Sequence, residues 1–306
     1  MDVLIITAPI FLLIGLGFFA VRQGFTPSEA IPGMASFVLY FAIPAVIFSN
    51  VVRMDFTTLF DPRFIGVYAS ATLGSLFLGF GLAHWGMKRK SLHSAVLAVG
   101  IATPNSLFIG LPVLVQVFGE VPTVFTMAVM VENLLVVPTA LILMERAAND
   151  GTSGVNWRAV GGRVIKSPLI LSILAGVVVA LSGVTVPVIL DKMLAMLAQA
   201  AGALALFVIG GSLVGMTVRE VGTDTLLVSG GKLILQPALA FLVLMCVPGL
   251  DDVSRITILL LCAVPMFSIY PIIGGNYGFR RQCAATLLIT TLTSFFTLTL
   301  LLSFLR

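Results

Sequence analysis

Thr103-Pro104-Asn105-Ser106-Leu107-Phe108-Ile109-Gly110-Leu111-Pro112 is a stretch that places two prolines inside one long apolar segment. A second apolar segment is interrupted in the same way in Val264-Pro265-Met266-Phe267-Ser268-Ile269-Tyr270-Pro271. Proline removes a backbone hydrogen bond from a helix and clashes with the preceding turn. In lipid the freed carbonyl groups find no water, so such an interruption is tolerated only where it lines a cavity or packs against protein. Two interrupted segments at matching places in two halves of a chain are typical of the binding site of a secondary transporter.

The composition is that of a chain that lives in a membrane. Of its 306 residues, 59% are hydrophobic and only 10% are charged, whereas soluble domains carry about 25% charged residues. Each apolar segment between charges is near the ~20 residues that cross the hydrocarbon core of a bilayer. The sequence therefore predicts an all-α integral membrane protein with ten transmembrane helices, over residues 3–21, 30–52, 64–87, 94–119, 121–144, 167–190, 193–218, 225–250, 256–279 and 282–305.

The distribution of lysine and arginine between the predicted loops indicates the orientation. Eleven basic residues fall on one side of the membrane and five on the other, and the richer side is cytoplasmic by the positive-inside rule. We therefore expect a multi-pass protein of the inner (cell) membrane, with both termini outside the cytoplasm. The net charge of +4 is spread over loops, so we expect the lipid bilayer, and no nucleic acid, as a partner.

The two halves of the chain share a spacing that indicates a duplication. Pro104 and Pro265 are 161 residues apart, and Ala8-Pro9 and Ser167-Pro168 are 159 apart. Five spans is an odd number, so the second half would be inverted relative to the first. We predict a first repeat over 1–146, a cytoplasmic linker over 147–166 and a second repeat over 167–306. The alternative is that any ten-helix protein shows approximate spacing of this kind.

An inverted pair of interrupted helices has an electrostatic consequence. A helix that restarts within the membrane exposes backbone N–H groups, equivalent to roughly half a positive charge. Two crossing interruptions would bring two such helix starts to one point, where an anion can bind with little help from side chains.

Several motifs resemble those of the auxin efflux carrier family. They are Pro104-Asn105-Ser106 followed by Ile109-Gly110-Leu111-Pro112, Lys232 five residues before Pro237, and Gly274-Gly275-Asn276-Tyr277-Gly278. The resemblance covers essentially the whole chain. Residues 265–271 lack the asparagine of the Pro-x-x-x-Asn pattern that most bacterial members carry, and resemble the malonate-carrier branch instead. In auxin-type members the corresponding asparagine is a substrate contact.

The resemblance implies a fold like that of NhaA and the bile acid transporters, with crossed, broken helices 4 and 9. It implies that spans 1, 2, 6 and 7 form a scaffold, with a possible homodimer contact, and that spans 3–5 and 8–10 form a transport domain. It also implies elevator-type alternating access. Gly210, Gly211 and Gly215 in the predicted seventh span would give a small-residue face, used either for simple packing or for sliding.

We predict a substrate-binding site at the two interruptions. Asn105 would orient a carboxylate, cap the broken helix, or do both, because its amide carries two donors and an acceptor. Ser268 would be a polar contact from the ninth span, and Tyr270 either a contact or an aromatic wall. The complete predicted set is Thr103, Pro104, Asn105, Ser106, Pro265, Met266, Phe267, Ser268 and Tyr270.

Two charged residues fall well inside predicted spans, Glu132 in the fifth and Lys232 in the eighth. An intramembrane charge costs about 2.5–3.5 kcal/mol on insertion scales and is therefore a functional candidate. Glu132 would either couple proton movement to transport or hold a fixed structural partner, Lys232 or a backbone carbonyl. Lys232 would compensate the charge of a dianionic substrate or of Glu132, or extend its ammonium group to the membrane surface.

These features predict a secondary carrier of a small organic anion, with malonate or a similar dicarboxylate as the first choice. Another carboxylate, an auxin-like amphipathic anion, or a channel are the alternatives. An enzyme would need paired intramembrane aspartates, a Ser–His pair or metal-ligand spacing, and the predicted spans contain no aspartate. We predict no cofactor and no metal site, and either H+ or Na+ as a coupling ion.

Overall fold

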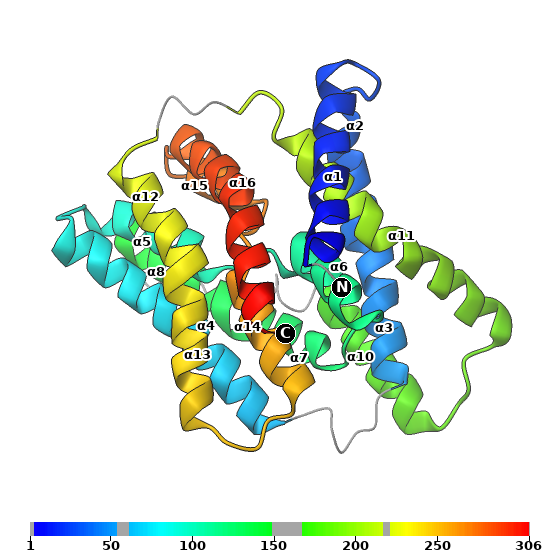
Figure 1. The fold of residues 1–306 in the computed structure, drawn as a ribbon. Helices are drawn as coiled ribbons and strands as arrows, with labels where there is room; N and C mark the ends of the chain where they lie inside the picture. The colour runs from blue at the N-terminus through cyan, green and yellow to red at the C-terminus, as the bar shows by residue number, and fades with distance from the viewer. Residues whose placement is uncertain (1–2, 54–60, 149–166, 217–220, 306) are drawn as a thin grey trace. The chain divides into compact units, whose positions relative to one another are not determined.

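The computed structural model describes residues 3–53, 61–148, 167–216 and 221–305, and is helical throughout these ranges apart from turns (Figure 1). Six helices are long and apolar enough to cross a membrane: Ala30–Val52, Pro62–Gly86, Val124–Ala148, Val188–Ser212, Thr223–Cys246 and Arg280–Phe304. Four shorter apolar helices accompany them: Thr7–Arg22, Ser91–Ala102, Ser106–Phe118 and Pro168–Ser182. The prediction of an all-helical membrane protein is confirmed at this level. The predicted linker 147–166 lies outside the described residues from 149 onward.

The chain divides into two compact units, each built from both halves of the sequence. Unit 1 takes residues 1–61, 107–130 and 161–214. Within it α1 packs along α11, and α3 packs against both α10 and α11 (Figure 1). Its helices are α1 (Val3–Arg22), α2 (Ala30–Phe37), the π-helical turn η1 (Val38–Ala42), α3 (Ile43–Val52), α6 (Leu111–Phe118), α7 (Val124–Val131), α10 (Pro168–Ser182) and α11 (Val188–Ser212).

Unit 2 takes residues 62–106, 131–160 and 215–306. It contains the second interrupted segment and the part of the first that ends at Ser106. Its hydrophobic core surrounds α5, which is buried from Ser94 to Ala102. Its elements are α4 (Pro62–Gly81), η2 (Leu82–Gly86), α5 (Ser91–Ala102), η4 (Glu132–Val136), α8 (Val137–Ala148), α12 (Thr223–Gly230), η5 (Gly231–Leu235), α13 (Gln236–Cys246), α14 (Asp252–Ala263), α15 (Tyr270–Gly275) and α16 (Arg280–Phe304).

Prolines explain where most of the π-helical turns lie. Each of η1, η3 (Ser106–Gly110), η4 and η5 ends two residues before a proline, which are Pro44, Pro112, Pro138 and Pro237. Proline lacks a backbone N–H, and its ring collides with the carbonyl of the preceding turn. A locally wider turn relieves that collision while the helix continues, and π turns are frequent at functional sites. Glu132 and Lys232 both lie inside such turns.

Glycines allow α1 and α11 to approach backbone to backbone in unit 1. A Cβ on Gly210 would lie 1.8 Å from the carbonyl oxygen of Ile14, and one on Gly17 would lie 2.1 Å from that of Phe207. Gly211 likewise faces Ile31 and Val21. Gly210 and Gly211 therefore serve close packing. Gly215 lies beyond the end of α11, in a left-handed turn with φ +80°, so its predicted place on a helical face is wrong.

The boundary between the predicted sixth and seventh spans is also wrong. The sequence placed it at Asp191 and Lys192, whereas α10 ends at Ser182 and α11 already begins at Val188. The turn between them uses Gly183 in a left-handed conformation and Pro187 before the new helix. Because this turn carries no charge, segmentation by charges does not detect it.

Candidate functional site

The backbones of the two interrupted segments pair directly with each other. The helix of the first segment ends at Ala102 and resumes at Ser106, and that of the second ends at Ala263 and resumes at Tyr270. Between them, Pro104 and Met266 form an isolated antiparallel bridge. The Asn105 N–H donates to the Pro265 carbonyl at 2.8 Å, and the Phe267 N–H donates to the Thr103 carbonyl at 3.1 Å. Backbone groups that the interruptions remove from the helices thus satisfy each other across the two segments.

The predicted polar contacts of the two interruptions also meet. The Asn105 amide nitrogen donates to the Ser268 hydroxyl at 3.0 Å. Asn105 is buried, whereas Ser268 is partly exposed. Ser268 is therefore the accessible member of the pair. Thr103 uses its hydroxyl to donate to the carbonyl of Val99, at 2.6 Å in the last turn of α5. Asn105 and Ser268 are therefore the side chains of this group that face each other across the bridge.

Glu132 lies next to the first interruption. Its Oε1 accepts a hydrogen bond from the Ser106 hydroxyl at 2.5 Å and another from the Tyr68 hydroxyl, also at 2.5 Å. Ser106 is the first residue of the resumed helix, and Tyr68 comes from α4. All three side chains are buried. The carboxyl group is thus fixed to the start of η3 and to the neighbouring helix, and Tyr68 is a partner that the sequence reasoning missed.

Lys232 lies close to the C-terminal ends of α5 and α14, the helices that precede the two interruptions. Its ammonium group donates to the Cys262 carbonyl at 2.8 Å, in the last turn of α14, and to Gln236 Oε1. The Gln236 amide in turn donates to the Ala102 carbonyl, the last of α5, at 3.0 Å. A positive charge is favourable at a helix C-terminus, where free carbonyls concentrate negative potential. Lys232 and Gln236 together therefore cap both helix ends.

This arrangement decides between the interpretations of Lys232. The side chain is fully buried, so the interpretation that it extends to the membrane surface is wrong. Within the described part of the chain Lys232 and Glu132 each have their own partners and form no direct ion pair. Gln236, whose amide bonds the Ala102 carbonyl, was missed by the sequence reasoning. Its position four residues after Lys232, one helical turn away, is the signal that could have revealed the pair.

The aromatic residue of the second interruption fills core space. Tyr270 is buried in the hydrophobic cluster of unit 2, together with Met266. A Cβ on Gly100 of α5 would lie 2.7 Å from the Tyr270 ring carbon that bears the hydroxyl, so only glycine leaves room for the ring. Phe267 packs at the edge of the same cluster and is partly buried.

A family model described as membrane transport protein matches residues 2–302. The chain belongs to this family. A protein of Rhizobium meliloti strain 1021 named "Putative malonate transporter" is 29% identical, over 97% of this chain and 94% of its own length. The "Uncharacterized transporter YfdV" of Escherichia coli K12 is 25% identical, over 93% of this chain and 91% of its own length. The resemblance to the auxin efflux carrier family is confirmed, and this protein is a membrane transporter and not an enzyme.

Hydroxyl groups tie two long helices of the transporter together. Thr225 of α12 contacts Thr286 of α16 at 3.1 Å, and one turn later the Ser229 hydroxyl contacts that of Thr290 at 2.7 Å. The two helices lie side by side, as their yellow and red ribbons show (Figure 1). Thr290 thus contributes to packing between α12 and α16.

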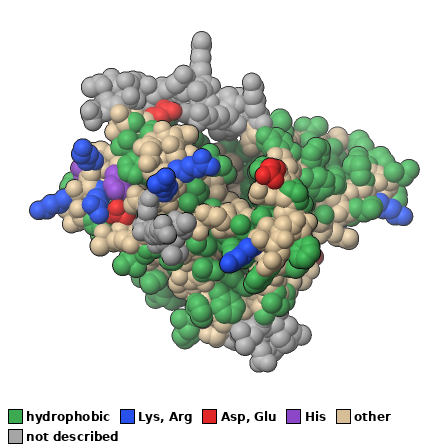
Figure 2. Space-filling model, turned by 90° about the horizontal axis from the view of Figure 1, so that it is seen from above, with side chains coloured by type: hydrophobic (Ala, Val, Ile, Leu, Met, Phe, Trp, Pro, Cys, Tyr) green, Lys and Arg blue, Asp and Glu red, His purple; other side chains and the backbone are tan. Residues whose placement is uncertain are grey.

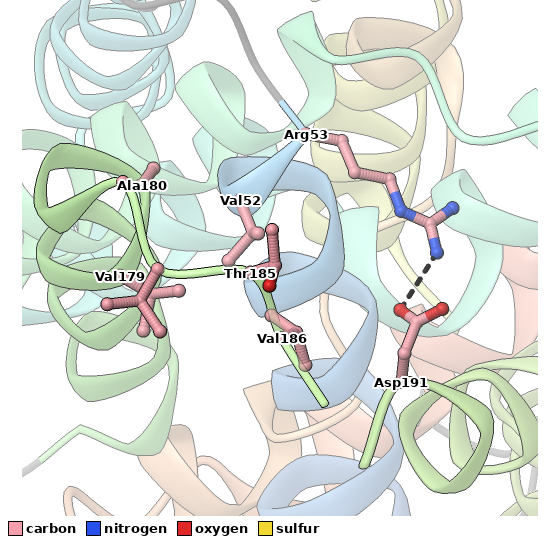
Figure 3. Close-up of a pocket in the computed structure, with 9 residues that line it drawn as sticks. Val52, Arg53, Val179, Ala180, Thr185, Val186 and Asp191 are labelled. Carbon is pink, nitrogen blue, oxygen red and sulfur yellow. Dashed lines mark hydrogen bonds and ion pairs between the residues drawn. The ribbon is translucent and has the colours of Figure 1, made fainter. Parts of the chain in front are cut away.

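Two cavities in unit 1 contain none of the predicted site residues. One, of about 390 Å³, lies between the ends of α3 and α10 and the start of α11, where Arg53 and Asp191 form an exposed ion pair at 3.0 Å (Figure 3). The other, of about 320 Å³, is mainly apolar and is lined by α1, α3, α6 and α11, with Pro112 and Gln199 among its residues. Neither offers the convergent polar groups expected of a small-anion site.

Proposed function

We propose that this transporter is a secondary carrier of a small organic anion, with malonate or a similar short dicarboxylate as its substrate. The observation that carries the proposal is the antiparallel pairing of the two interruptions, with Asn105 and Ser268 in contact beside it. Matching interruptions in two halves of a membrane chain are the best sequence pointer to a carrier site. The name of the Rhizobium meliloti relative supports malonate as the first substrate to test.

The charges around the interruptions favour an anion. Lys232 and Gln236 cover the carbonyl ends of α5 and α14, which would otherwise repel a negative group. The helix that restarts at Ser106 and runs to Phe118 presents its N–H end on the other side of the interruption, and helix N-termini attract carboxylates. In this proposal Asn105 orients one carboxylate, Ser268 contacts it from the second segment, and Lys232 balances the second negative charge through space.

The proposed architecture is ten spans in two inverted repeats of five, with the fourth and ninth crossing at the paired interruptions. Spans 1, 2, 6 and 7 would form the scaffold, and they lie in unit 1. Both interruptions lie in unit 2, which supports their movement together as a transport domain in an elevator-type cycle. Residues 107–130, the second half of span 4 and the start of span 5, are grouped with unit 1. We propose a homodimer through the scaffold helices.

We also propose that both termini lie outside the cytoplasm of the inner membrane, supported by the excess of basic residues in the opposite loops. Alkaline phosphatase fused to either end should be active, and green fluorescent protein fused to either end dark. A cytoplasmic readout at one end alone would contradict the ten-span count.

Uptake of labelled malonate into proteoliposomes tests the function. We expect saturable uptake that an inward proton gradient stimulates and that unlabelled short dicarboxylates block. Ser268→Ala and Asn105→Ala should reduce it, while Ser303→Ala, which removes an exposed hydroxyl near the C-terminus, should not. Uptake of another anion, but not of malonate, would support carrier function and contradict malonate as the substrate. Flux that never saturates and shows no counterflow would indicate a channel.

A further inference from the structure

A basic turn follows α4 and η2 and is held rigidly by its central residue. The Arg89 N–H donates to the Ala83 carbonyl at 3.0 Å, and the Arg89 carbonyl contacts the His84 ring at 2.9 Å and accepts from the Ser94 hydroxyl at 3.3 Å. Lys88 has φ +55°, the one left-handed non-glycine residue among those described. Such a backbone persists only where its surroundings fix it. The two lysines that flank Arg89 are therefore presented by a fixed backbone.

The same arginine connects this turn to the start of α16. The Arg89 guanidinium donates to one oxygen of Asp224 at 2.9 Å, and the Gln282 amide donates to the other oxygen at 2.8 Å. The His93 ring stacks on the Phe279 ring with centroids 4.6 Å apart. Asp224 thus accepts hydrogen bonds from two segments nearly 200 residues apart in the sequence. The exposed residues next to those donors border one area of unit 2.

Four exposed cations border this area: Lys88, Lys90, Arg280 and Arg281. Among the residues that the structure describes, none of the four forms an ion pair, and Asp224 pairs with Arg89 and His93 instead. The chain has only two histidines, His84 and His93, and both belong to this region. Figure 2 shows lysine and arginine side chains gathered around the histidine atoms and an acidic side chain. These four cations and the turn that carries Lys88 and Lys90 therefore form a basic patch that could bind an anion.

An apolar face leads directly to the basic turn. Leu78, Leu82 and Trp85 follow one another at helical spacing on α4 and η2, and are 47%, 47% and 75% exposed. The Trp85 ring folds back over Gly81, where an added Cβ would lie 3.2 Å from it. Tryptophan prefers the headgroup level of a bilayer, with its ring between hydrocarbon and water. If Trp85 lies at that level, Lys88, three residues further along the chain, would be within reach of lipid phosphates.

We propose that this surface binds an anionic glycerophospholipid. The phosphate headgroup would contact Lys88 and Lys90, with Arg280 and Arg281 as a second border, and the acyl chains would lie along Leu78, Leu82 and Trp85. Clusters of basic residues beside a membrane helix attract anionic lipids with about 1 kcal/mol per lysine or arginine. The fixed turn adds to this attraction a preformed geometry, which a disordered basic loop lacks. The inference is independent of the transported substrate.

Trp85 itself can report the binding. The chain has two tryptophans, so Trp157→Phe leaves Trp85 as the only one. We would reconstitute this variant into phosphatidylcholine containing a small fraction of brominated phosphatidylglycerol or brominated phosphatidylcholine, and measure fluorescence quenching. Brominated phosphatidylglycerol should quench well beyond its mole fraction, and brominated phosphatidylcholine in proportion to it. The preference should fall roughly fivefold for each lysine neutralised at low salt, as expected from ~1 kcal/mol each.

Matched variants separate this site from general charge attraction. Lys88→Gln/Lys90→Gln should lower the preference about 25-fold, and Lys88→Arg/Lys90→Arg should keep it. Arg22→Gln/Lys192→Gln removes the same charge from exposed positions of unit 1 and should leave the preference intact. Equal quenching by both lipids in the Trp157→Phe protein, or equal losses in the two neutralised variants, would overturn the proposal. If Lys88→Gln/Lys90→Gln does not fold, a salt titration of the Trp157→Phe protein decides, because salt should remove the phosphatidylglycerol preference alone. Inorganic phosphate should not compete.

Discussion

The Lys232 ammonium group binds the carbonyl of Cys262 at 2.8 Å, inside the apolar part of the chain and with no exposure to solvent. This contact places the Lys232 side-chain nitrogen at the end of α14, where free carbonyls make the potential negative. Replacing Lys232 by methionine would keep most of the side-chain volume but leave the Cys262 carbonyl and the Gln236 oxygen unpaired. An unsatisfied buried group costs about 1–3 kcal/mol.

We therefore expect Lys232→Met to lower the midpoint of thermal unfolding of the purified protein and to reduce malonate uptake more than tenfold. Lys192→Met, at an exposed position of α11, should change neither. Unchanged unfolding together with full uptake would show that Lys232 does not stabilise the two helix ends.

Glu132→Gln tests coupling separately from structure. Glutamine keeps a side-chain oxygen that can accept from Ser106 and Tyr68, but it has no carboxyl group that can gain and release a proton. If Glu132 couples proton movement to transport, gradient-driven net uptake is lost while malonate counterflow continues. Loss of both activities together with poor expression would instead assign Glu132 a structural role. Tyr68→Phe, which removes one donor, should weaken uptake less than Glu132→Gln does.

Asn105 and Ser268 should show coupled effects on the affinity for malonate. Their side chains are in contact at 3.0 Å, and contacting residues are non-additive when changed together. We expect the double variant Asn105→Ala/Ser268→Ala to weaken binding by less than the two single changes predict, with a coupling of about 0.5–1.5 kcal/mol. Competition against labelled malonate measures it. Strict additivity would mean that the two side chains act at separate places.

Gly210→Ala should lower the thermal unfolding midpoint of the protein, whereas Gly15→Ala should not. A Cβ at position 210 would lie 1.8 Å from the Ile14 carbonyl oxygen, while one at position 15 meets nothing within 4 Å. Overpacking costs about 1–3 kcal/mol, and alanine in place of a helical glycine with open space beside it gains up to ~1 kcal/mol. Thermal unfolding in the same detergent compares the two variants. Equal midpoints would refute the close packing of α1 and α11.

The prolines made the helix interruptions predictable from the sequence. The low content of charged residues made it predictable that the chain is a membrane protein. Both are local signals: Pro104 and Pro265 each lack the backbone N–H that a regular helix interior uses, whatever their surroundings. The partners of Glu132 were not predictable in this way, because Tyr68 is 64 residues distant and its approach depends on how α4 packs. Lys232 was ambiguous for the same reason. The turn at Gly183 was missed because neighbouring apolar residues give no change of polarity, although a glycine four residues before a proline is a weak turn signal.

The π turns make the direction of each side chain depend on the number of residues in the helix as well as on their types. Each π turn contains one residue more than the α-helical turn it replaces, and one residue corresponds to about 100° of helix rotation. Deleting a single residue before Pro138 or Pro237 would therefore restore a regular helix and turn Glu132 or Lys232 away from its partners without substituting either. A one-codon deletion at either position would therefore change which side chain faces these partners while leaving the composition of the helix almost unchanged.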